Sequence, residues 1–385
     1  MKLTSVLGAV FFACLAFTSC DKHGDDSPEL SAEYLGDSNN GGSGDNQPGV
    51  ITAGEWNDLN NWKFWESIIS SEDFKDFPAY WSFFNTNRIS VNITSDGTKP
   101  VINAVVQLKN NGTTLFTART DNFGNAELWP NLLQSNNELD FSKLSIQVNN
   151  GAKIVTTVKP YSQEVNKIIM PETAVDNKIE ISFVVDATGS MGDELEYLKT
   201  ELLDVISRVK TANPKASVYT SSVFYRDAGD DYVTRVSGFT NDNRITTNFI
   251  AGQSAAGGGD TPEAVHSALD KALNELQWST NARTRLLFLL LDAPPHYQPE
   301  IIQDLHRSIG KATEKGIKII PIAASGIDKK TEFLMRFFSL TTNGTYVFIT
   351  NHSGVGNEHL EPTVGQYEVE FLNNLMVRLI NKYAQ

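Results

Sequence analysis

The chain has 385 residues, of which 40% are hydrophobic and 20% charged, so it is long enough for two or three domains with cores of their own. Its 32 Lys and Arg residues against 46 Asp and Glu residues give a formal net charge of −14. Such an acidic chain is poorly suited to holding a phosphate backbone, which argues against a nucleic acid as partner. After the first twenty positions no apolar run approaches the roughly 20 residues that a membrane-spanning helix needs.

The first twenty residues predict an export signal. An apolar stretch at 6–17 follows Lys2 and ends shortly before Cys20. This arrangement resembles the lipobox of bacterial lipoproteins, in which a signal peptidase cuts before a Cys that then carries lipid, although Phe17 stands where Leu is usual. We therefore expect residues 1–19 to be a signal peptide and Cys20 to be lipidated. Cleavage of an ordinary secretory signal near this point is the alternative.

Cysteine content and the following segment agree with export. The two cysteines are Cys14 and Cys20, so the mature protein would have neither a disulfide nor a free thiol. Residues 20–50 are rich in Asp, Ser, Asn and Gly and predict a flexible linker. Its aspartates at 21, 25 and 26 fit either a sorting signal for the outer membrane or cell surface or a solvated linker. We expect a bacterial envelope protein that contacts the membrane only through its N-terminal lipid.

Aromatic residues are concentrated in residues 51–86. This segment holds four of the six tryptophans, Trp56, Trp62, Trp65 and Trp81. Exposed aromatic rings can stack on sugars, which would indicate carbohydrate binding. Because aromatic side chains are also ordinary core material, we expect instead that the segment packs on a neighbouring domain.

Residues 87–160 change to short alternating apolar runs separated by turn residues, which indicates a small all-β sandwich. Residues 100–108, followed by the hairpin sequence at 118–128, resemble carboxypeptidase-regulatory-like and related prealbumin-like modules. The resemblance implies a spacer domain. Asp121 fits a calcium ligand or, more simply, a residue of the hairpin turn.

Residues 176–385 alternate buried strands with amphipathic helices. This alternation predicts the α/β class, with a doubly wound, mostly parallel sheet and helices on both faces. Pro321 cannot donate to a strand ladder, so it should lie near a strand end or at a locally unpaired edge. The clearest expected strands are 179–185, 216–225, 286–291 and 317–322, and the clearest expected helices are 262–276 and 299–315.

Polar side chains follow the ends of two of these strands. Asp186, Thr188 and Ser190 come after the first, and Asp292 follows the strand at 286–291. Ligand sites in such sheets lie beyond the carboxyl ends of the strands, so we expect these side chains to converge. Carboxylate and hydroxyl oxygens suit a hard divalent cation, Mg²⁺ first, with Mn²⁺ or Ca²⁺ as alternatives.

These motifs resemble the metal-ion-dependent adhesion site of the von Willebrand factor A (VWA) family. Asp186, Thr188 and Ser190 match the family's DxSxS motif in its DxTGSM form, and Asp292 matches the later Asp. The resemblance covers residues 176–385. It implies a bound divalent cation with one open position, which an acidic group of a partner completes.

One ligand position departs from the family pattern. Where the family has a Thr after two glycines, this chain has Gly259, followed by Asp260 and Thr261. We expect Asp260 to take the place of that ligand, with Thr261 as the alternative. An additional carboxylate would lower the net charge of the site and favour retention of the cation.

Other polar residues near these motifs have simpler interpretations. Asp193, Glu194 and Glu196 begin the next helix and are expected only to favour its positive N-terminus. Residues 226–231 are expected to form a solvated charge cluster. His296 is interpreted as a structural loop residue, with a place at the border of the site as the alternative. A second metal site is a weaker interpretation of His352, His359 and Glu361.

The sequence thus predicts a non-enzymatic, lipid-anchored envelope protein that binds a protein or surface polymer through a divalent cation. A structural scaffold with a stabilising metal is the alternative. A metal-dependent hydrolase is weaker, because the chain has neither GxSxG nor HExxH. No GxGxxG follows the first strand and no GxxxxGK[ST] occurs, so no nucleotide is expected.

Overall fold

The computed structural model describes residues 47–135, 138–259 and 261–385. The expected signal peptide, Cys20, Asp260 and most of the expected linker lie outside the described residues. Within this described part of the chain, no helix is long and apolar enough to cross a membrane.

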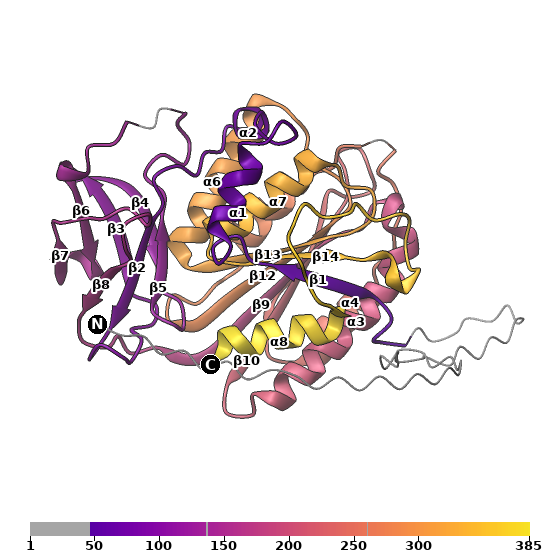
Figure 1. The fold of residues 1–385 in the computed structure, drawn as a ribbon. Helices are drawn as coiled ribbons and strands as arrows, with labels where there is room; N and C mark the ends of the chain where they lie inside the picture. Colours follow the sequence, from indigo (N-terminus) through magenta and orange to yellow (C-terminus); the bar gives the residue numbers. More distant parts are fainter. Residues whose placement is uncertain (1–46, 136–137, 260) are drawn as a thin grey trace, which may run out of the picture. The chain divides into compact units, whose positions relative to one another are not determined.

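An eight-stranded sheet organises the C-terminal part of the chain, in the order β11-β10-β9-β12-β13-β14-β1-β15 (Figure 1). The five strands from β10 to β14 in this order run parallel, whereas β11 and β1 are antiparallel to their neighbours. The strands are β1 (Thr52–Trp56), β9 (Asp176–Asp186), β10 (Ser217–Tyr225), β11 (Thr234–Thr240), β12 (Ala282–Leu291), β13 (Ile317–Ala323), β14 (Tyr346–Ile349) and β15 (Val369–Phe371).

Helices cover both faces of this sheet, because successive strand residues point to opposite sides. Phe183 and Phe288 face one helix layer, and the neighbouring Val184 and Leu287 face the other. The first layer holds α3 (Gly192–Ala212), α4 (Asn243–Ala251) and α8 (Leu372–Ala384). The second holds α5 (Val265–Asp270), α6 (Pro299–Lys315) and α7 (Lys329–Thr341). The predicted α/β class with a mostly parallel sheet is confirmed.

The observed helix bounds and strand pairing agree with the predictions from the sequence, with one difference. The helix predicted at 299–315 has those bounds, but the one predicted at 262–276 begins at Val265 and changes to a π-helical turn at Lys271–Glu275. Along β13 the pairing with β12 is continuous, whereas pairing with β14 begins only at Ile322. Pro321 therefore stands just before that ladder, at a locally unpaired edge as predicted.

Residues 87–170 form the smaller all-β part, which has two sheets in the orders β5-β2-β8 and β4-β3-β6-β7. Its last strand ends at Ile169, beyond the expected boundary at 160. The Asp121 carboxylate accepts the N–H groups of Phe123 and Asn125 at 2.9 Å, which is the turn role. The strands are β2 (Ile89–Thr94), β3 (Val105–Asn110), β4 (Thr113–Arg119), β5 (Asn125–Leu128), β6 (Leu144–Val148), β7 (Lys153–Val155) and β8 (Asn166–Ile169).

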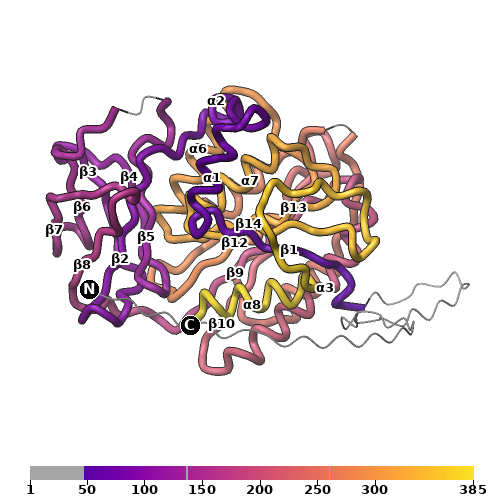
Figure 2. The backbone as a smooth tube through the Cα atoms, in the orientation of Figure 1, coloured from indigo at the N-terminus to yellow at the C-terminus, as the bar shows by residue number. Residues whose placement is uncertain are grey.

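The N-terminal described segment joins the main sheet, which the sequence did not predict. Strand β1 lies between β14 and β15, and Figure 2 shows this segment running beside β14. Helices α1 (Trp62–Ile69) and α2 (Phe77–Trp81) follow it. Trp65 is buried, with its ring centroid 5.7 Å from that of Phe333 on α7. Residues 51–86 are thus partly a strand of the α/β sheet and partly a layer over α7.

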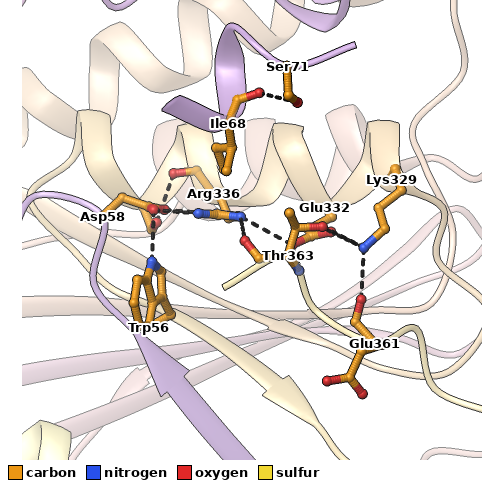
Figure 3. A network of polar contacts seen from close by, with 10 residues as sticks. Trp56, Asp58, Ile68, Ser71, Lys329, Glu332, Arg336, Glu361 and Thr363 are labelled. Carbon is orange, nitrogen blue, oxygen red and sulfur yellow. Dashed lines mark hydrogen bonds and ion pairs between the residues drawn. The ribbon is translucent and has the colours of Figure 1, made fainter. Parts of the chain in front are cut away.

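A buried ion network fastens this segment to α7 (Figure 3). Arg336 donates to both carboxylate oxygens of Asp58, at 2.6 and 3.0 Å, and to Glu332 at 3.2 Å. Glu332 also accepts from Lys329 at 3.1 Å and from the backbone N–H of Thr363 at 2.7 Å. Each buried charge here has an opposite charge beside it.

Candidate metal centre

The first predicted loop is assembled at the carboxyl end of β9. Asp186 is the last residue of β9, and its Oδ1 accepts both the backbone N–H of Thr188 at 2.9 Å and the Thr188 hydroxyl at 2.6 Å. Ser190 Oγ lies 3.2 Å from Thr188 Oγ1. Asp186 and Thr188 are fully buried. The structure therefore brings these three predicted residues together.

Asp292 joins them from the neighbouring parallel strand, since it directly follows β12. Burial, and then the charge of Asp292, raises the pKa of Asp186 to about 7. Burial likewise raises the pKa of Asp292 to about 6. Both directions show that negative charge at this point is not compensated by the surrounding side chains.

Glu263 is a further member of the site that the sequence analysis missed. It is only 2% exposed, and its backbone N–H donates to the carbonyl of Pro294 at 2.9 Å. Burial and the charges of Asp186 and Asp227 raise the pKa of Glu263 to about 9. The one available signal in the sequence was its place directly after Pro262, three residues beyond Asp260, the expected ligand.

Glycines allow the loop before α5 to approach the Asp186 loop. A Cβ on Gly258 would lie 2.7 Å from both Glu263 Oε1 and Thr188 Cβ, and Gly258 has φ +76°. Gly189 N–H donates to the Gly257 carbonyl at 3.1 Å. A larger side chain at 258 would hold the two loops apart, and one at 257 would collide with the Asp230 carboxylate.

The structure does not test the first choice for the variable ligand position. Asp260 lies outside the described residues. Thr261 is exposed, whereas Glu263 two positions later is buried. Both Asp260 and Thr261 stay predictions.

The expectation of a solvated cluster is wrong for Arg226 and Asp227, which are buried, and for the half-buried Asp230, whereas Asp231 is exposed as expected. Arg226 is buried and donates to the Ala187 carbonyl at 3.1 Å. Asp230 accepts the backbone N–H of Gly258 at 2.9 Å. His296 Nε2 lies 2.7 Å from Asp227 Oδ1, so this histidine borders the site through Asp227. The cluster thus supports both loops, and the sequence missed it because its partners are far apart along the chain.

Glu194 also differs from its expected role at the helix N-terminus. It is buried, and its Oε1 accepts the backbone N–H of Ser325 at 3.1 Å and lies 2.9 Å from His359 Nε2. The other ring nitrogen of His359 lies 3.0 Å from Asn351 Oδ1. Both nitrogens of His359 are therefore engaged, which argues against a second metal site there.

The residues at the carboxyl ends of β9 and β12 fit a divalent cation. Asp186 Oδ2, Glu263 Oε2 and Asp292 Oδ1 are buried, and none has a hydrogen-bond partner among the described residues. None of these three residues takes part in an ion pair of the described chain. Such groups are costly to bury without a counter-charge.

The donor types point to a hard cation. Across residues 47–135, 138–259 and 261–385, no group of three or more His, Cys, Asp or Glu side chains is placed to hold a metal alone. A cation here would therefore depend on the hydroxyls of Thr188 and Ser190 and on water, beside the carboxylates. All-oxygen coordination of this kind suits Mg²⁺, Mn²⁺ or Ca²⁺.

Comparison with known proteins identifies the domain that carries this site. Residues 180–355 match the family model of the von Willebrand factor A domain. The C-terminal α/β part of this chain therefore contains a VWA domain. The match includes Asp186, Thr188, Ser190, Glu263 and Asp292.

Two curated relatives are similar to part of this chain. A putative ariadne-like RING finger protein of Acanthamoeba polyphaga mimivirus is 32% identical over 137 residues, which is 35% of this chain and 13% of that protein. An alpha-protein kinase of Dictyostelium discoideum is 30% identical over 121 residues, which is 31% of this chain and 19% of that protein. The chain thus matches less than a fifth of the length of either relative.

Similar solved structures include three bacterial proteins. BatB of Bacteroides thetaiotaomicron has a TM-score of 0.37 at 13% identity, covering 54% of this chain and 98% of that one. An aerotolerance-related membrane protein of Bacteroides fragilis has a TM-score of 0.34 at 12% identity, covering 53% and 99%. The pilus adhesin SpaC of Lactobacillus rhamnosus has a TM-score of 0.37 at 12% identity, covering 55% and 30%.

Proposed function

We propose that the VWA domain of residues 180–355 binds a divalent cation and, through it, an acidic group of a protein or surface polymer. Mg²⁺ is the first choice, with Mn²⁺ and Ca²⁺ as alternatives. The observation that carries the proposal is that Asp186 and Asp292, at the ends of neighbouring strands, and Glu263 have buried carboxyl oxygens without a partner, with the hydroxyls of Thr188 and Ser190 beside Asp186.

Asp186, Thr188, Ser190 and Asp292 would hold the cation, and Glu263 would add a third carboxyl group beside them. When bound, the cation supplies the positive charge that attracts a carboxylate of the partner. Thr188 and Ser190 contribute no charge, so they leave part of the cation's charge for that ligand. Glu263 has the opposite effect, because its ionised form would neutralise more of the cation and hold it more firmly.

Residues around the site would fix its loops. Arg226 holds the Ala187 carbonyl next to Asp186, and Asp230 holds the backbone of Gly258. The loop before α5 and the loop after β9 therefore keep their spacing through contacts that do not use the proposed ligands. Such preorganisation lowers the entropy lost when a cation or a partner binds.

The cellular setting in this proposal comes from the sequence pattern at the N-terminus. Lipidation of Cys20 would anchor the chain to a bacterial envelope membrane, with the outer membrane or the cell surface as the expected place. The β-sandwich, if it belongs to the carboxypeptidase-regulatory-like modules it resembles, would act as a spacer. The proposal includes no membrane contact besides the lipid, no nucleic acid, no nucleotide and no catalysis.

Calorimetric titration of Mg²⁺ into the mature chain tests the metal site. We expect saturable binding in the wild type, loss of binding in Asp186→Ala, and unchanged binding in Asp193→Ala. Asp193 is the matched control, because it is an exposed aspartate at the start of α3, the helix that follows the Asp186 loop. Equal binding by wild type and Asp186→Ala, with both proteins folded by circular dichroism, would overturn the proposed site.

A second titration separates adhesion from a scaffold role. Poly-glutamate serves as the carboxylate probe, added to the Mg²⁺-loaded chain and to the chain in EDTA. Binding that requires Mg²⁺ and fails in Asp186→Ala supports recognition of acidic partners. A higher melting temperature with Mg²⁺, but no probe binding, would favour a scaffold whose metal only stabilises the fold.

A further inference from the structure

A second cluster of like charges lies where the sandwich meets the amino ends of β12 and β13. There a cavity of about 30 Å³ is lined by residues from β4, β12, β13 and the ends of α6 and α7. Four of its lining side chains are cationic: Arg119, Arg283, Arg285 and Lys318. This end of the sheet is opposite to the metal centre, which follows the carboxyl ends of β9 and β12.

Most of this positive charge has no counter-charge in contact. Lys318 pairs with Asp121 at 3.1 Å. By contrast, the ion pairs of the described residues include none of Arg119, Arg283 and Arg285. The arginines therefore give the cavity an excess of positive charge.

Nearby carboxylates are already engaged elsewhere. Glu127, which lines the cavity, binds Arg88 through both oxygens at 2.8 and 3.0 Å. Glu180 lies beside Arg285 in the strand register, but its oxygens accept from the backbone and hydroxyl of Ser279. Neither carboxylate forms an ion pair with the arginines of the cavity.

Arg285 is the central residue of this cluster. It is only 3% exposed, and it donates through Nε to the Ser279 carbonyl at 2.7 Å and through Nη1 to Asn103 Oδ1 at 3.1 Å. Its Nη2 is buried and has no hydrogen-bond partner among the described residues. Burial, and then the charge of Arg119, lowers the pKa of Arg285 to about 10.

Two further hydrogen-bond donors around the cavity are also buried and unpaired. Arg283 Nε and Thr341 Oγ1 are buried, and the described part of the chain offers them no partner. A guanidinium that is buried without a counter-charge is destabilising. Three unused donors and an excess of positive charge together favour a negatively charged ligand over a neutral one.

We propose that this cavity binds one small monovalent inorganic anion of chloride size. Chloride is little larger than a water molecule, so a cavity that admits water-sized groups has room for it. Arg285 Nη2, Arg283 Nε and the Thr341 hydroxyl supply the donors.

The bound anion would join the sandwich to the α/β sheet. Arg119 comes from β4 of the sandwich, and Arg285 comes from β12 of the sheet. Arg119 is already held against α6, because its Nε donates to the Glu314 carbonyl at 2.9 Å. Its stem also packs on Gly316, where a Cβ would come within 2.9 Å. The anion would thus neutralise arginines from both parts at once.

Thermal unfolding of the mature chain tests this site. Sodium gluconate is replaced stepwise by sodium chloride at constant ionic strength, with EDTA present so that the metal centre does not contribute. We expect a saturable rise in melting temperature of a few degrees. Binding stabilises the folded chain by about this much when the ligand concentration is well above the dissociation constant. Sodium bromide should act in the same way.

Two variants make the result specific. Arg285→Met should lose the chloride-dependent rise, whereas Arg235→Met should keep it, because Arg235 is exposed on β11. If Arg285→Met does not fold, Thr341→Val removes one donor at similar volume and should raise the chloride midpoint at least severalfold. An equal rise in wild type and Thr341→Val would then overturn the proposal.

Crystals grown in sodium bromide give the direct test. We expect an anomalous peak within hydrogen-bond distance of the three donors, Arg285 Nη2, Arg283 Nε and Thr341 Oγ1. Equal melting temperatures in gluconate and chloride, or density in the cavity that fits water alone, would contradict the proposal. These measurements contain no divalent cation, so they are independent of the proposed adhesion function.

Discussion

The two ends of the main sheet bury opposite charges, and neither end is balanced. Asp186, Glu263 and Asp292 gather at the carboxyl end, whereas Arg283 and Arg285 lie near the amino end of β12. The Arg336 network shows that the same fold also buries charges in matched sets. Unmatched burial of several like charges at each end is the observation on which both proposed ligand sites rest.

The largest expected effect concerns the Arg336 network, whose buried charges are paired, in contrast to those at the two ends of the sheet. Arg336→Met leaves Asp58 and Glu332 buried without their common cation, and we expect it to lower the free energy of unfolding by about 3–5 kcal/mol. Urea unfolding measures this change.

Lys329→Met is the matched control for Arg336→Met. Lys329 also bonds to Glu332, but its side chain is partly exposed, so its loss should cost less than about 1 kcal/mol. If the two variants lose equal stability, the network does not depend on a buried counter-charge.

The second prediction concerns the packing of the two metal-site loops. Gly258→Ala places a Cβ against Glu263 and Thr188 at a positive φ, so we expect a loss of about 2 kcal/mol in unfolding free energy and at least tenfold weaker Mg²⁺ binding. Gly259→Ala is the control, because a Cβ at that position meets no atom within 4 Å. Equal Mg²⁺ affinity in both variants would show that the spacing of the loops does not matter.

The third prediction is a pH dependence of the metal-free chain. The pKa values of Asp186, Asp292 and Glu263 are raised to about 7, 6 and 9, so the folded chain binds more protons than the unfolded chain over this range. The stabilisation is complete below the ordinary carboxyl pKa and is lost as pH rises through the raised values. Urea unfolding in EDTA should therefore show stability falling from about pH 5 to pH 9.

Mg²⁺ should reverse this slope, because the cation stabilises the ionised carboxylates and binds better at high pH. Glu263→Gln should flatten the upper part of the slope, between about pH 7 and pH 9. A metal-free chain whose stability rises across the same range would show that the three carboxyl groups are compensated after all.

The smallest expected effect comes from exposed charges. Lys271 and Glu275 form an ion pair on one helical turn, with the Lys271 side chain partly exposed and that of Glu275 exposed. Lys271→Met should change the free energy of unfolding by less than about 0.5 kcal/mol. A larger loss of unfolding free energy would mean that burial does not explain why some ion pairs contribute more to stability than others.

Four of the proposed metal ligands were predictable because each stands next to a strong local pattern. Asp186, Thr188 and Ser190 follow a continuous apolar strand, and Asp292 follows another. Glu263 has no such neighbour. It enters the site only because its loop lies against Pro294, more than thirty residues later in the chain.

The sequence by itself determined the strands and helices of the α/β part and the order of the polar loops, because hydrophobic periodicity is a local property. Tertiary structure decided that β1 joins the sheet between β14 and β15, and that Glu194 meets His359. It also gathered the arginines of the proposed anion cavity from separate strands. These outcomes depend on register and burial across long chain separations, which no local pattern encodes.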